Sequence, residues 1–194
     1  YVPYFPLKKY TVTVRHLTSH TGGIRHYANS NEVLNTKPYY SVKESIAIFK
    51  DDSLLFKPGT KHSYSSYGFN LLSAAMEGAS SVPFVKYMQQ EVFKPLAMHN
   101  TTADHTDSII TNRTRFYENR FNRLVNAPFV DNSNKWAGGG FLSTPIDLVK
   151  MAQALTAKKF INASTVEQLW TPYKLSTGGN NIYGIGFRIE TDNA

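Results

Sequence analysis

The sequence predicts an α+β fold with a largely helical lobe, and three observations lead to this prediction. Helical periodicity dominates the first half of the chain. A stretch rich in aromatic and β-branched residues follows at 113–130, and a further helical segment and an apolar, strand-like segment come after it. Helices that are grouped in sequence, rather than alternating with strands, are typical of α+β folds. No repeat, low-complexity tract or flexible linker indicates a domain boundary.

Two short helices are expected near the start of the chain. Thr13 can cap the first, and the HTGG segment at 20–23 is expected to end it, because glycine accepts a left-handed backbone. Ser41 and Glu44 form a capping-box pattern before the second helix. That helix is expected to bury three apolar residues on one face, Val42, Ile46 and Phe49.

Two longer helices should follow. The turn-rich segment 56–68 leads into an apolar run at 69–76, whose shared helical face contains Phe69, Leu72 and Met76. Another helix is expected between Pro83 and Pro95, with apolar residues at fourfold spacing, Phe84, Met88 and Val92.

The second half of the chain should contain a β-hairpin, a helix and a strand. TRFYEN and RLVNAPFV predict the hairpin, with its turn at 121–123. Thr144 can be the N-cap and Pro145 the first residue of the helix. This helix is expected to bury Leu148, Ala152 and Leu155. The segment YGIGFRIE at 183–190 predicts a strand.

Composition indicates one globular unit. The chain has 194 residues, of which 41% are hydrophobic, and no apolar run is long enough to cross a bilayer. Without cysteine it can form neither disulfides nor thiolate metal sites. Tyr1 is not an initiator methionine and begins no signal-peptide pattern, so we expect the true N-terminus to lie upstream.

The net charge of +7 raises the possibility of a nucleic-acid partner, which we do not expect. The basic residues are dispersed, and the densest group falls on both faces of the expected hairpin: Arg113, Arg115, Arg120 and Arg123. Three N-x-[ST] sequons, at Asn100, Asn112 and Asn162, carry no information without a known compartment.

The most site-like cluster is Tyr64-Ser65-Ser66, which lies in a turn just before an expected helix. A helix N-terminus presents free N–H groups and a positive dipole end, so it favours an anionic or developing-oxyanion ligand. In the alternative interpretation, Ser65 or Ser66 only caps the helix and Tyr64 fills a gap. The residue pattern alone leaves both interpretations open.

No metal or cofactor is expected. His16 and His20 have an i, i+4 spacing, but the H-E-x-x-H zinc motif is absent. WAGGGF lacks the spacing of a phosphate-binding loop, and a tight turn under a packed helix accounts for its glycines.

Four segments succeed one another in the order typical of a known superfamily: HLTSHTGGIRHY, FKPGTKHSYSSYGFNLLSAAME, FKPLAMHNTT and WAGGGFLSTPIDLVKMAQAL. In these segments the chain resembles class C beta-lactamases and penicillin-binding proteins. The stretch at 112–144 is similar to their mitochondrial beta-lactamase-like branch. The resemblance covers nearly the whole chain. It implies a beta-lactamase/DD-peptidase-like fold, mostly the helical lobe with part of the α/β lobe.

The superfamily works with three motifs, S-x-x-K, Y-x-N or S-x-N, and K-T-G or H-x-G. The resemblance places the second motif on Tyr64-Ser65-Ser66, which makes Tyr64 catalytic and Ser66, in place of the usual Asn, substrate-binding. No S-x-x-K occurs in the sequence. The first and third motifs are expected upstream of Tyr1 and beyond Ala194, so residues 1–194 are expected to be an internal part of one domain. His20-Thr21-Gly22 mimics the third motif but precedes Tyr64, and we interpret it as structural.

The resemblance therefore implies a mitochondrial serine hydrolase, a peptidase or amidase that forms an acyl-enzyme on a serine outside this sequence. The 194-residue chain alone is expected to be inactive. The implied partners are a peptide or small amide substrate and further copies of the chain. The alternative is a non-catalytic scaffold or binding protein that has lost its catalytic lobe, with filament formation as one form of that role.

Overall fold

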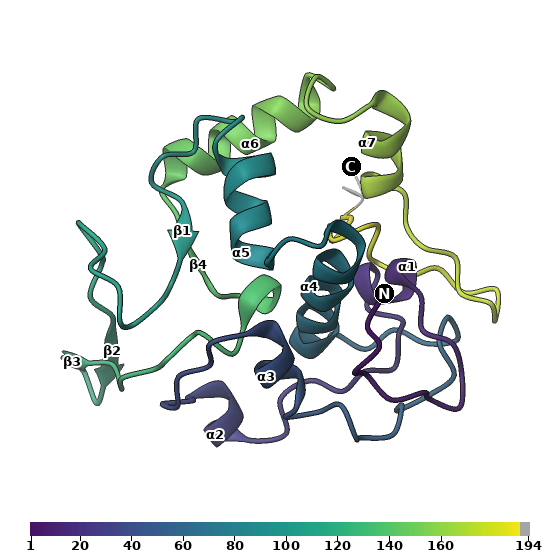
Figure 1. Cartoon of the computed structure of the whole chain (residues 1–194), viewed down its shortest axis with the longest axis horizontal. Helices are drawn as coiled ribbons and strands as arrows, with labels where there is room; N and C mark the ends of the chain where they lie inside the picture. Colours follow the sequence, from purple (N-terminus) through teal and green to yellow (C-terminus); the bar gives the residue numbers. More distant parts are fainter. Residues whose placement is uncertain (191–194) are drawn as a thin grey trace.

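The computed structural model describes residues 1–190, and helix α4, Ser66–Ser80, lies at the centre of its helical part (Figure 1). Helix α4 packs against α1, α3, α5 and the 3-10 helix η2. The remaining helices have the following bounds: α1 Val14–Thr18, α2 Ser30–Val33, α3 Val42–Ile46, α5 Phe84–Tyr87, the π-helix η1 Met88–Phe93, η2 Trp136–Gly138, α6 Pro145–Thr156 and α7 Ala163–Trp170.

The strands form two separate antiparallel pairs, which gives the α+β composition that the sequence predicts. β1, Thr102–Ala103, pairs with β4, Phe141–Leu142. β2, Tyr117–Arg120, and β3, Arg123–Asn126, form the predicted hairpin, which projects from the body of the molecule (Figure 1). Phe121 and Asn122 both have positive φ, as a two-residue hairpin turn of matching twist requires.

The predicted helix starts are confirmed. The hydroxyls of Thr13 and Thr144 cap α1 and α6, and Pro145 is the first residue of α6. The Ser41 hydroxyl accepts from the Glu44 N–H at 3.2 Å, while the Glu44 carboxylate reaches the N–H of Tyr40 instead of Ser41. These starts are predictable because a cap is a local interaction.

The expected end of α1 and the expected helix at 83–95 need correction. Ser19 is the C-cap of α1, and the residue after it in the left-handed region is His20, at φ 55°, rather than a glycine of the HTGG segment. The segment after Pro83 is α-helical only to Tyr87 and continues as the π-helix η1. The helical run ends near Pro95, as expected.

The core lies between α4 and the N-terminal helices. Val42, Ile46 and Phe49 are buried as predicted, and the Phe49 ring stacks on Tyr67 with centroids 4.5 Å apart. The predicted face of α4 is shifted, since Phe69, Leu72 and Met76 are only half-buried. Because elements pack on several sides of α4, its buried residues extend around the helix, to Tyr67, Asn70, Leu71, Ser73, Ala74 and Ala75.

Two further predictions are wrong. Of the three α6 residues expected to be buried, only Leu155 is, while Leu148 is 56% exposed and Ala152 is also exposed. The segment 183–190 is not a strand. A single bridge joins Tyr183 to Arg188 around a turn that contains Gly186 at φ 76°. Within residues 1–190 no helix is long and apolar enough to span a bilayer.

Candidate active site at the start of helix α4

The site is built on the cap of α4. Ser65 is the N-cap residue, and its hydroxyl accepts from the Gly68 N–H at 2.9 Å and donates to the Arg25 carbonyl at 2.7 Å. Ser65 rather than Ser66 is therefore the capping serine, and its second bond joins the helix start to the segment that follows α1. This cap fixes the direction in which the chain enters the helix and so the position of Tyr64.

Two histidines bind the backbone at the same helix start. The Ser65 N–H donates to Nδ1 of His20, and the Ser66 N–H donates to Nδ1 of His26, both at 3.2 Å. A ring nitrogen that accepts a hydrogen bond carries no proton, so both imidazoles are neutral with their proton on Nε2. His20 and His26 thus hold the two residues that follow Tyr64 in fixed positions.

Tyr64 lies over the rings of His20 and His26 and is 49% exposed. Its ring centroid is 4.3 Å from that of His20, in a tilted stack, and 5.4 Å from that of His26, edge to face. Within residues 1–190 no hydrogen bond, ion pair or cation–π contact involves Tyr64. The ring is therefore held by its faces, and the hydroxyl is open to a ligand.

Burial keeps the histidines of the site uncharged. It lowers the pKa of His20 to about 4, with smaller contributions from His62 and His26, and it also lowers the pKa of His26 and of His62. The His62 ring lies 6.1 Å from that of His20 and stacks on Tyr183 at 5.5 Å. At neutral pH the three histidine rings around Tyr64 are therefore polar but carry no positive charge.

Ser66 lies at the first position of α4 and is buried. Burial raises the pKa of Tyr27, and the nearby Ser66 side chain partly offsets this effect. The Tyr27 ring lies 4.4 Å from His26. Ser66 is thus enclosed within the protein, beside Tyr27 and beside the His26 ring that accepts its N–H.

The glycine-rich loop 138–140 passes directly beneath the start of α4. A Cβ at Gly138 would lie 2.7 Å from the Ser66 carbonyl and from Oδ1 of Asn70, which is closer than real contacts allow. Nδ2 of Asn70 donates to the Asn134 carbonyl at 2.5 Å and fixes the same loop. The interpretation of these glycines as a tight passage under a packed helix is confirmed.

Tyr64, Ser65 and Ser66 remain the predicted site residues, and the local pattern gave no signal for the contacts of His20, His26 and Tyr27 with them. The hydrogen bonds that His20 and His26 accept span 45 and 40 residues of sequence, so no local spacing could predict them. His16, by contrast, accepts from the Thr13 N–H at the start of α1, and His20 lies beyond the end of that helix, so the two do not share a helical face.

A family model described as Beta-lactamase matches residues 1–192 of the chain. The human protein named serine beta-lactamase-like protein LACTB, mitochondrial, is 34% identical over 89% of this chain. The aligned part is 47% of that relative, so the chain spans about half of its length.

Two solved structures have the same fold. A D-stereospecific amidohydrolase from Streptomyces superposes with a TM-score of 0.77 at 23% identity, over 95% of this chain and 59% of the other. A penicillin-binding protein from Bacillus halodurans superposes with a TM-score of 0.75 at 24% identity, over 92% and 57% of the two chains.

Proposed function

The chain belongs to the beta-lactamase family, and we propose that it contributes Tyr64, as the proton-transfer residue, to a serine hydrolase that cleaves amide bonds through an acyl-enzyme. The observation that carries this proposal is the position of Tyr64 at the start of α4, with its ring held by His20 and His26 and its hydroxyl open. The amidohydrolase named above has this fold, which supports an amide as the substrate class.

The proposed chemistry assigns two steps to one phenol. As the serine oxygen bonds to the substrate carbonyl carbon, its proton moves to the Tyr64 oxygen, and that proton then passes to the leaving nitrogen as the carbon–nitrogen bond breaks. A free phenol has a pKa of about 10, so the phenolate needs nearby cations. No cation contacts Tyr64 within residues 1–190. We assign this role to lysines of the first and third motifs, and the nucleophilic serine also lies outside this sequence.

Ser66 remains the proposed substrate-binding position. Its side chain is shorter than the Asn that usually occupies this place in the superfamily, and it lies beside Tyr27. The shorter side chain would leave space beside Tyr64 for a larger substrate group. A substrate amide would then contact Ser66 and Tyr27 together, and Ser66 would affect binding more than the chemical step.

We also propose that residues 1–194 are an internal part of one catalytic domain, that the whole protein acts in mitochondria, and that it forms homo-oligomers. The length relative to the human protein and that protein's mitochondrial name support the first two proposals. For the third, Phe121 is fully exposed and Leu124 is 77% exposed on the projecting hairpin, which is an apolar surface that another copy could cover.

A scaffold or binding role is the second candidate, and the exposed apolar residues of the hairpin, Phe121 and Leu124, favour it. Labelling with a fluorophosphonate probe, which reacts with activated serines, separates the two candidates. For the enzyme, the full-length protein should be labelled stoichiometrically at an S-x-x-K serine and the 194-residue chain should not be labelled. An unlabelled full-length protein would support the scaffold, and labelling of the 194-residue chain would contradict the placement of the nucleophile outside it.

A further inference from the structure

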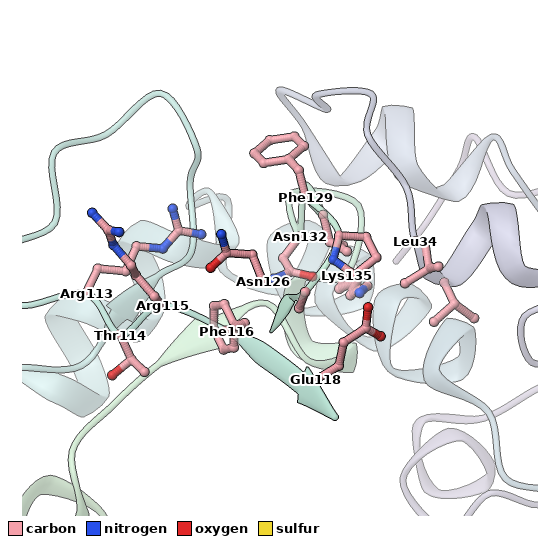
Figure 2. Close-up of a pocket in the computed structure, with 14 residues that line it drawn as sticks. Leu34, Arg113, Thr114, Arg115, Phe116, Glu118, Asn126, Phe129, Asn132 and Lys135 are labelled. Carbon is pink, nitrogen blue, oxygen red and sulfur yellow. The ribbon is translucent and has the colours of Figure 1, made fainter. Parts of the chain in front are cut away.

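A second site candidate lies apart from Tyr64, between helix α2 and the hairpin. It is a cavity of about 700 Å³ with walls formed by the end of α2, by strands β2 and β3 and by the loop that leads to Lys135 (Figure 2). A cavity of this volume is in the range that proteins use for small molecules. No residue of the candidate active site lines it.

The wall has an excess of positive charge. Arg113, Arg115 and Lys135 line the cavity, and its carboxylate, Glu118, is paired with Arg120 at 2.5 Å. Within residues 1–190 neither Arg115 nor the Lys135 ammonium has an ion pair or a side-chain hydrogen bond. Two of the three cations on the wall therefore have no ion-pair partner among the described residues.

Only some of the hydrogen-bond donors of the Arg113 guanidinium have a partner. Its Nη2 lies 2.7 Å from Oδ1 of the buried Asp104, and Asn132 donates to the other oxygen of that carboxylate at 2.8 Å. The Nε of Arg113 is buried and has no partner among the described residues. Burial lowers the pKa of Lys135, against the opposing effect of Asp104. A buried donor without a partner and a partly desolvated ammonium both favour an anionic ligand, because each lacks the water or counter-charge that would satisfy it.

The rest of the wall is apolar. Phe116, Phe129 and Leu34 line the cavity and are 54%, 61% and 45% exposed, so their surfaces are free to be covered. Figure 2 shows the side chains of Arg113 and Arg115 on one side of the cavity and that of Lys135 on the other, with Phe116 between them. A ligand that fills this space must carry both a negative charge and an apolar part.

We propose that this cavity binds a carboxylate with an apolar tail: the basic side chains on its two sides, Arg115 and Lys135, attract the carboxylate, and the tail covers Phe116 and Phe129. This binding site does not depend on the proposed hydrolase activity.

Titration of the ¹⁵N-labelled 194-residue chain by NMR tests the proposal with three probes, octanoate, octan-1-ol and acetate. Octanoate should shift the amide signals of 113–118 and 126–135 and should bind at least about tenfold more tightly than either probe that lacks the tail or the charge. Equal affinity for octanoate and octan-1-ol, equal affinity for octanoate and acetate, or shifts confined to other residues would overturn the proposal.

Matched variants separate a specific contact from general attraction to a basic chain. Lys135→Met keeps the alkyl stem and should weaken octanoate about tenfold while leaving octan-1-ol unchanged. Lys159→Met removes one charge from an exposed lysine that does not line the cavity and should change neither affinity. Should Lys135→Met not fold, Arg115→Gln at an exposed position takes its place, with a weaker octanoate affinity expected. Equal losses in the cavity and control variants would contradict the site.

Discussion

Helix α4 and the β2–β3 hairpin differ in what holds their residues in place. Around α4, residues from distant parts of the sequence are buried and joined by hydrogen bonds, as in the bond from the Asn70 side chain to the Asn134 carbonyl. On the hairpin, Phe121 and Leu124 are largely exposed, and β2 pairs only with β3 within the described residues. The difference indicates that the packed region around α4 fixes the position of the candidate catalytic residue, Tyr64. The hairpin can vary without moving Tyr64.

The largest expected effect on stability comes from truncating a branched aliphatic side chain of the same size in each of the two regions. Ile46→Ala, at a fully buried residue that packs in the α4 core, should lower the free energy of unfolding by about 2–5 kcal/mol, because it removes apolar contacts and leaves a cavity. Leu124→Ala, at a residue 77% exposed, should change it by less than about 0.5 kcal/mol. Urea denaturation measures both, and equal losses would remove the distinction between the regions.

The second-largest expected effect is a loss of folding stability at acidic pH. His20 has a folded-state pKa of about 4 against 6.5 for a free side chain, so the unfolded chain takes up its proton first as the pH falls. Stability should therefore be complete above about pH 6.5 and decline between pH 6.5 and 4, by up to about 3 kcal/mol for this residue. His26 and His62, whose pKa values are also lowered, should add to the decline in the same direction.

The variant that checks the contribution of His20 is His20→Asn. Asn tolerates the left-handed backbone at this position and offers an oxygen to the Ser65 N–H, but it does not titrate. Thermal unfolding of both proteins between pH 7 and pH 4 should show a smaller acid loss for the variant. An unchanged acid profile would mean that His20 does not control the stability of the helix start.

The smallest stability effect is expected at the cap itself. Ser65→Ala removes the hydroxyl that accepts from the Gly68 N–H and should cost on the order of 1 kcal/mol. The matched change Ser164→Ala, at an exposed residue of α7 that is not its N-cap, should cost less. Comparable losses for the two would argue against Ser65 as the cap.

Local signals predicted the parts of the fold that depend on neighbouring residues. The caps at Thr13, Ser41 and Thr144 and the hairpin turn follow from short-range hydrogen bonds and backbone preferences, and all are confirmed. The turn before an apolar run also predicts a site at Tyr64 and the serines after it, and this stays a prediction.

The predictions that failed concern features set by contacts between distant segments. The 183–190 segment has strand-forming residues, but Gly184 packs against the Leu169 carbonyl so closely that a Cβ would lie 2.1 Å from it, and the chain turns there. The predicted burial of Leu148 and Ala152 needs a packing partner, and helical periodicity alone does not say whether one is present. The bond from Ser65 to His20 is likewise set by tertiary packing, which sequence periodicity does not encode.

The central claim is that Tyr64 transfers protons and Ser66 does not. Steady-state kinetics of Tyr64→Phe in the full-length protein tests it most directly, with Ser66→Ala as the control. Because the ring and its contacts with His20 and His26 remain, Tyr64→Phe should lower kcat by about 10²- to 10⁴-fold and change KM much less. Ser66→Ala should raise KM and keep kcat within about threefold. A Tyr64→Phe enzyme with kcat within about threefold of the unaltered protein, alongside an inactive Ser66→Ala enzyme, would contradict the account.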